Sequence, residues 1–155
     1  MAYFAAPKLT FTFDLELRVE KAHLPGKTPI GNRRIIRVEG GHFNGEYIKG
    51  EVIPGGDDWI TVREDGTIIQ DVRILLRTDD NEIILMTYRG IRTGPKEVLA
   101  RLDNNEHVNP EEYYFRTVPI FETASEKYDW MNKTAFVSTG QRLATGVKYS
   151  VYQVD

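Results

Sequence analysis

The segment TIIQDVRILLRT, residues 67–78, places an acid and a base inside a strand-like apolar run. Asp71 and Arg73 are two residues apart, so a strand would carry both on one face. The opposite face, which includes Gln70, is also mostly apolar, so neither face has the pattern of a solvent-exposed surface. A carboxylate and a guanidinium on a covered apolar face are typical of a ligand cavity in a barrel. The alternative is a buried ion pair that fixes the strand register.

Three further side chains in strand-like segments could bind a ligand or transfer a proton. Tyr88 in EIILMTYRG is a candidate hydrogen-bond donor or weak acid, or else an ordinary core tyrosine. Arg116 lies among the aromatic residues of EYYFRTVPIFET, where a guanidinium can stack or bind a carboxylate. Glu122 follows the apolar residues PIF, and a carboxylate shielded there would suit proton transfer. The alternative for Glu122 is an ion pair at a hairpin end.

The residue types that are missing exclude several chemistries. The chain has no cysteine, and His23, His42 and His107 form no metal-binding motif, so we expect no metal site. Nucleophile-elbow, phosphate-loop and dinucleotide-binding motifs are also missing. Cofactor-independent acid–base chemistry remains, of the isomerase, cyclase or lyase type.

Each candidate residue has an expected part in that chemistry. Asp71 or Glu122 would act as the base, and Arg73 or Arg116 would stabilise an oxyanion. Tyr88 would donate a proton.

The elements that position these residues are short strands. Residues 9–19 alternate strictly between apolar and polar, which predicts a strand with one buried face. Turn signals then recur about every ten residues, which indicates an antiparallel sandwich or barrel. Residues 95–103 and 125–132 are predicted to form short helical segments, because the first begins with proline and the second with a capping serine.

Composition bounds the class of protein. The 155 residues match one domain, residues 1–155, and show no linker or repeat. The formal net charge is −3 with acids and bases mixed along the chain, so we expect no nucleic-acid partner. No apolar run approaches the roughly 20 residues of a membrane span, so no membrane association is expected. The lack of cysteine and of a signal-peptide pattern predicts a cytoplasmic protein.

Several motifs, in the same order, resemble the family catalogued as domain of unknown function 3237. They are GGHFNGEYIKGEVIPGGDDW, IIQDVRILLRTDD, MTYRG, YYFRTVPIFETASEKYDWMN and GVKYSVYQV. The resemblance implies a single-domain antiparallel β-barrel, lipocalin-like in general shape. Asn81 stands where a turn glycine is usual, and Asn tolerates the positive φ that such a turn needs.

The resemblance also implies further site residues. Asp58 and Trp59 end the first motif, while Tyr128, Trp130 and Asn132 belong to the fourth. We expect these five to bind a ligand, although the tyrosine and tryptophan of YDWMN would also serve as a plug for the barrel. The family accompanies catabolic and natural-product pathways, which favours a small organic or aromatic substrate.

Two functional hypotheses follow. The first is a small-molecule-binding β-barrel that acts as a cofactor-independent enzyme. The second is a non-catalytic carrier or sensor of small apolar ligands. A third possibility, an oligomerisation or scaffold protein, would lack a cavity and expose an apolar patch. Under any of the three the apolar outer face of residues 68–76 favours a homo-oligomer.

Overall fold

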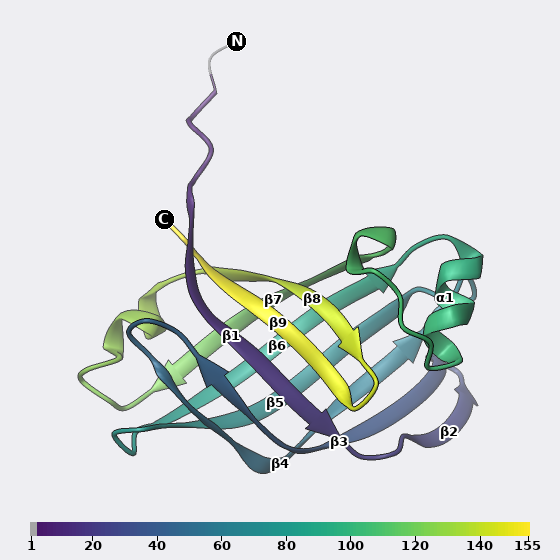
Figure 1. Ribbon diagram of the computed structural model, residues 1–155, viewed down its shortest axis with the longest axis horizontal. Coiled ribbons are helices and arrows are strands. Elements are labelled where there is room, and N and C mark those ends of the chain that lie inside the picture. The colour runs from purple at the N-terminus through teal and green to yellow at the C-terminus, as the bar shows by residue number, and fades with distance from the viewer. Residues whose placement is uncertain (1–2) are drawn as a thin grey trace.

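The computed structural model describes residues 3–155 as one antiparallel sheet with three short helical segments (Figure 1). The strands are β1 (Leu9–Val19), β2 (His23–Thr28), β3 (Gly31–Asn44), β4 (Lys49–Val62), β5 (Ile68–Thr78), β6 (Ile83–Thr93), β7 (Tyr114–Thr123), β8 (Phe136–Leu143) and β9 (Gly146–Val154). The helical segments are α1 (Lys96–Asp103) and the 3-10 helices η1 (Pro110–Glu112) and η2 (Asp129–Lys133).

The sheet closes on itself. Strands β1, β9, β8, β7, β6, β5, β4 and β3 pair in that order, and β1 also pairs with β3. Leu15 shows the closure, because its Cα lies opposite Phe43 of β3 on one side and opposite Tyr149 of β9 on the other. The protein is therefore a closed eight-stranded antiparallel β-barrel with β2 as an extra strand beside β3. This confirms the predicted barrel and rules out the sandwich.

Alternation along β1 produces the buried face that the sequence predicts. Phe13, Leu15 and Leu17 are buried, and the residues between them are at least partly exposed. Leu9 and Phe11 have the same parity in the sequence but are exposed, because the register with β9 shifts between Phe11 and Phe13. Phe11 therefore lies opposite Tyr152 and packs against its ring at 5.8 Å. The strand was predicted correctly, and its apolar face is shorter than expected.

The end of the barrel next to η2 is filled by aromatic side chains. The ring centroids of Phe121 and Phe136 are 4.8 Å apart, and Phe13 lies 5.8 Å from Phe121. Trp130 of η2 lies 6.0 Å from Phe136, and Met131 beside it is fully buried. Edge-to-face aromatic packing of this kind fills volume densely. The η2 end is therefore a packed plug.

Helix α1 covers the opposite end of the barrel (Figure 1). It buries Val98, Leu99 and Leu102 and exposes its polar face. Helix α1 confirms the helical segment predicted at residues 95–103. Of residues 125–132 only the last four are helical, in η2, and the cap expected from Ser125 is wrong, because the N-cap is Tyr128 and makes no side-chain hydrogen bond. No helix within residues 3–155 has the length and apolarity of a membrane span.

The turn between β5 and β6 has the backbone expected of it. Asn81 has a φ of 65°, in the left-handed region that asparagine tolerates. The hydroxyl of Thr78 donates to Asp80 at 2.6 Å and accepts from the backbone N–H of Glu82 at 2.8 Å. The hairpin that carries Gln70 and Tyr88 is thus fixed at its tip.

Candidate functional site

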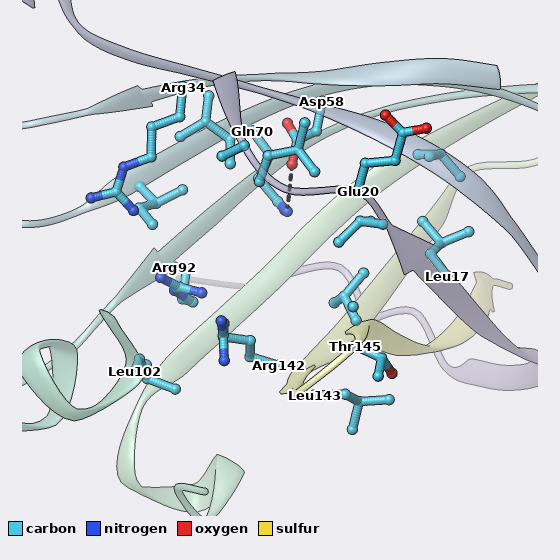
Figure 2. A pocket seen from close by; sticks show the side chains of 18 of the residues that line it. Leu17, Glu20, Arg34, Asp58, Gln70, Arg92, Leu102, Arg142, Leu143 and Thr145 are labelled. Atoms are coloured by element: carbon cyan, nitrogen blue, oxygen red, sulfur yellow. Dashed lines mark hydrogen bonds between the residues drawn. The ribbon is translucent and has the colours of Figure 1, made fainter. Parts of the chain in front are cut away.

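A cavity of about 480 Å³ lies inside the barrel at the α1 end. Its apolar wall includes Leu17 of β1, Ile60 of β4, Ile68 of β5, Phe115 of β7 and Leu102 of α1. Polar side chains from β3, β4, β5, β6 and β8 complete the lining (Figure 2). A mostly apolar cavity with a few converging polar groups is the usual form of a small-molecule site.

Asp58 of β4 is the buried carboxylate of this cavity. Its side chain points inward because it shares the parity of Ile60, and the residue is only 8 % exposed. Oδ2 accepts a hydrogen bond from Nε2 of Gln70 at 3.2 Å (Figure 2), and Oδ1 accepts one from the backbone N–H of Asp71 at 3.3 Å. Both carboxylate oxygens are therefore held by donors from β5.

The pKa of Asp58 is raised from 3.8 to about 7. Burial is the main cause, because desolvation penalises the charged form. The hydrogen bonds from Asp71 and Gln70 oppose the rise but are smaller. At neutral pH this carboxyl group therefore exists in both the acid and the base form, as a proton-transfer group requires.

Gln70 connects Asp58 to two buried tyrosines. Nε2 of Gln70 also donates to the hydroxyl of Tyr149 at 3.2 Å, and Tyr88 donates to the same hydroxyl at 3.0 Å. Burial, the largest cause, raises the pKa of both tyrosines, so they remain neutral hydrogen-bond donors. The rings of Tyr88 and Tyr149 pack edge to face at 5.2 Å, and Tyr149 packs on Phe115 at 5.5 Å. These residues form the floor between the cavity and the packed plug.

Gly90 of β6 leaves space for the Gln70 side chain. The two residues are direct cross-strand partners on the inner face of the barrel. A Cβ at position 90 would lie 2.3 Å from Oε1 of Gln70 and 2.9 Å from a methyl carbon of Thr117. Any larger residue would displace the amide that holds Asp58.

Three arginines line the cavity near α1 (Figure 2). Arg34 of β3 contacts Asp103 at the end of α1, with Nη1 at 3.5 Å from Oδ1. Arg142 of β8 donates from Nη1 to the side-chain oxygen of Asn105 at 2.7 Å. Arg92 of β6 is different, because its Nε is buried without a hydrogen-bond partner among residues 3–155.

The predicted site residues separate into three groups, which line the cavity, lie on the outside of the barrel or belong to the plug. Asp58 and Tyr88 line the cavity, as expected for a ligand site. Asp71, Arg73 and Trp59 lie on the outside of the barrel, around a shallow depression of about 340 Å³. The expectation that Asp71 and Arg73 line the interior is wrong, because the opposite parity of β5 points inward. The backbone N–H of Asp71 donates to Asp58, and the charge of Asp71 helps to raise the pKa of Asp58, but the Asp71 side chain does not line the cavity.

Arg116 and Glu122 of β7 are also on the outer surface, because Phe115, Thr117 and Phe121 occupy the inner face. The guanidinium of Arg116 stacks over the ring of Tyr114 at 5.1 Å and donates to the backbone oxygen of Phe115 at 2.9 Å. Glu122 is exposed, so the shielding expected for it is wrong. Neither side chain reaches the cavity.

Tyr128, Trp130 and Asn132 belong to the plug at the other end of the barrel. Asn132 accepts from the backbone N–H of Thr123 at 2.8 Å and donates to the backbone oxygen of the same residue at 2.9 Å. The Tyr128 hydroxyl donates to Asp80 at 3.1 Å. These contacts hold η2 on the barrel, as the plug interpretation predicts, and they do not line the cavity.

Sequence reasoning missed Gln70, Tyr149, Arg34, Arg92 and Arg142. Gln70 carried a usable signal, because it lies between Ile68 and Val72 on a face of β5 that is apolar up to Thr78 at its end. Arg92 shares the parity of Tyr88 on β6, which also indicated an inward side chain. Within the part of the chain described, no cluster of three or more His, Cys, Asp and Glu side chains is placed to hold a metal ion.

Fold and site together define a class: closed antiparallel barrels that are packed at one end and enclose, at the other, a mostly apolar cavity with a few polar groups. The chain belongs to the family described as "Protein of unknown function (DUF3237)", whose model matches residues 7–154. A UPF0311 protein of Clostridium acetobutylicum is 38 % identical over 144 residues, which covers 92 % of this chain and 91 % of that protein.

Solved structures and a named enzyme are also similar. The crystal structure of a conserved protein of unknown function from Rhodopseudomonas palustris has a TM-score of 0.93 at 34 % identity, over 99 % of this chain and 100 % of that one. A protein of Penicillium herquei named as a hydroalkoxylation enzyme is 28 % identical over 137 residues, covering 88 % of this chain and 76 % of that protein.

Proposed function

We propose that the protein is an enzyme that catalyses acid–base chemistry on a small organic substrate inside the barrel, without a cofactor. The observation that carries this proposal is Asp58, a buried carboxyl group in the cavity wall whose pKa is raised to about 7. Such a group changes protonation state near neutral pH and is shielded from bulk water, as a general acid–base requires.

The surrounding residues support that role. Gln70, Tyr149 and Tyr88 are linked by hydrogen bonds of 3.0 to 3.2 Å, and Gln70 donates to one oxygen of Asp58. This network fixes the carboxylate while leaving the cavity open in front of it. Gln70 and Tyr149 therefore act as positioning residues, and Asp58 is the residue that exchanges a proton with the substrate.

The related hydroalkoxylation enzyme supports a particular reaction type. Hydroalkoxylation adds an alcohol O–H across a carbon–carbon double bond, so the oxygen bonds to one carbon and a proton to the other. Asp58 can accept the hydroxyl proton in its charged form and supply a proton to carbon in its neutral form. The two transfers balance, and no oxidant or reductant is needed. Cyclisation, isomerisation and elimination use the same two transfers.

The proposal is tested with a panel of small hydroxylated alkenes and phenols, followed by chromatography and mass spectrometry. Purified protein should convert at least one member of the panel. Asp58→Asn should lower the rate by roughly 10²- to 10⁴-fold, the usual contribution of a general acid–base. Glu122→Gln is the matched control, because its side chain is exposed on the outer face of β7, and it should change the rate by less than about twofold.

Two outcomes would contradict the proposal that the protein is an enzyme with Asp58 as its acid–base group. Binding of panel members without any conversion would instead support the carrier or sensor hypothesis. Full activity in Asp58→Asn would show that another group transfers the proton.

A further inference from the structure

We propose that the cavity binds a substrate that carries a carboxylate, and that Arg92 and Arg142 grip this group beside α1 while the reacting part of the molecule lies against Asp58. This inference rests on the proposed function in treating the bound molecule as a substrate. Binding of a carboxylate can be measured separately from any conversion.

Arg92 provides the first observation. Its side chain points into the barrel from β6, and its Nε is buried with no hydrogen-bond acceptor among residues 3–155. A buried charged donor without an acceptor is unfavourable, so such groups are normally paired in the functional state. Because Arg92 lines the cavity and is only partly buried as a whole, a ligand bound there can supply an acceptor to its guanidinium.

Arg142 provides the second observation. Its backbone N–H donates to the Tyr113 hydroxyl at 2.9 Å, and its Nη1 donates to the neutral side chain of Asn105 at 2.7 Å. These contacts hold the guanidinium in position without neutralising it. Figure 2 shows Arg92 and Arg142 as neighbours beside Leu102 of α1.

The charges around the pair are unbalanced. The ion pairs found among residues 3–155 include Arg34 with Asp103 but neither Arg92 nor Arg142. Burial lowers the pKa of Arg92 and the nearby charge of Arg142 lowers it further, while the charge of Asp103 opposes the fall. A negative group placed between the two guanidiniums would offset the repulsion between them and stabilise the charged form of Arg92. Planar guanidinium groups bind planar carboxylates through two parallel hydrogen bonds, which favours a carboxylate as that group.

The arrangement of the cavity also defines the rest of the ligand. In Figure 2 Arg92 and Arg142 lie across the cavity from Asp58 and Gln70. Apolar side chains, including Ile60, line the space of about 480 Å³ that they share. The ligand class that fits is a small aromatic or unsaturated carboxylic acid whose reacting hydroxyl or double bond is separated from the acid group by an apolar body.

The test uses isothermal titration calorimetry with benzoate, 4-hydroxybenzoate, cinnamate and 4-hydroxycinnamate, each compared with its methyl ester. The wild type should bind at least one acid at least tenfold more tightly than its ester. Arg92→Met should abolish this preference. Arg73→Met is the matched control, because Arg73 is an arginine on the outside of the barrel, and it should retain the preference in full.

Arg142→Met gives a second readout if Arg92→Met fails to fold, and it should also reduce the preference at least several-fold. Equal affinity for acids and esters, no binding of any acid at millimolar concentration, or equal losses in Arg92→Met and Arg73→Met would overturn the inference.

The outcome is distinguishable from that of the proposed enzyme. Conversion of neutral substrates that depends on Asp58 would support the proposed enzyme and contradict the carboxylate site. Tight binding of an acid that is never converted would leave the carboxylate site without the enzyme.

Discussion

Asp58 makes the stability of the barrel depend on pH. The folded protein holds the proton of this carboxyl group up to about pH 7, whereas the unfolded chain releases it near 3.8. Between these values the folded state binds more protons, so raising the pH favours unfolding. At about 1.4 kcal/mol per pKa unit, the difference amounts to roughly 4 kcal/mol. The loss begins near pH 4 and is complete somewhat above pH 7.

Asp58→Asn should remove this loss. We expect the variant to gain roughly 2–4 kcal/mol in the free energy of unfolding at pH 8 and almost nothing near pH 4, because the neutral amide has no charge to bury. Urea denaturation at a series of pH values measures the effect. The control Glu122→Gln, at an exposed carboxylate on the outer face of β7, should follow the wild type. Parallel pH profiles for wild type and Asp58→Asn would contradict the burial of a titrating carboxylate.

At the scale of the elements, β5 and β6 form the site by direct pairing. Gln70 lies opposite Gly90, and this glycine provides the space in which the amide can reach Asp58. The pKa of Asp58 is therefore set partly by a residue on β6 that does not touch it.

Gly90→Ala should raise the pKa of Asp58 above about 7, because displacing Gln70 removes a hydrogen bond that now lowers it. Titration of the carboxyl carbon by NMR measures the change. Gly140→Ala is the control, since its Cβ would lie 2.8 Å from the Phe115 ring and not near Gln70. That variant should lose stability by about 1–3 kcal/mol through overpacking and leave the titration of Asp58 in place. Identical titrations in both variants would contradict the role of Gly90.

The strands and their alternation were predictable, but the direction of each face was predictable only where one face is polar. In β1 the alternating acids and hydroxyls identify the outer face. In β5 both faces are apolar, with Ile74 inside and Leu75 outside, so periodicity grouped Asp71 with Arg73 correctly and left their side undecided. The interior site depends on which strands meet across the barrel, and no local pattern contains that information.

At the scale of the whole molecule, the outer face of β5, β6 and β7 is unusually apolar. Its exposed side chains include Leu75, Leu85, Ile91, Val118 and Ile120. Leu75 is the cross-strand partner of Leu85, so these residues continue from one strand to the next. An exposed apolar surface that spans several strands is typical of an interface, which keeps the expectation of a homo-oligomer as a proposal.

We expect the wild type to elute as an oligomer, with its mass measured by light scattering after size exclusion. Ile120→Lys should shift the mass to that of the monomer, because a lysine there would be desolvated at the interface. Ile30→Lys is the matched control, since Ile30 is also exposed but lies in the turn between β2 and β3. A monomeric wild type, or dissociation in both variants, would contradict the proposed interface.

The division of the barrel into an aromatic plug and a hollow end has an evolutionary consequence. The phenylalanines beside η2 lie outside the residues that line the cavity, and β1, β3 and β9 close the sheet through their backbones. Substitutions around the cavity can therefore accumulate while the folding unit persists. A lineage that keeps the plug can vary the residues around the cavity and acquire new chemistries while the fold stays the same.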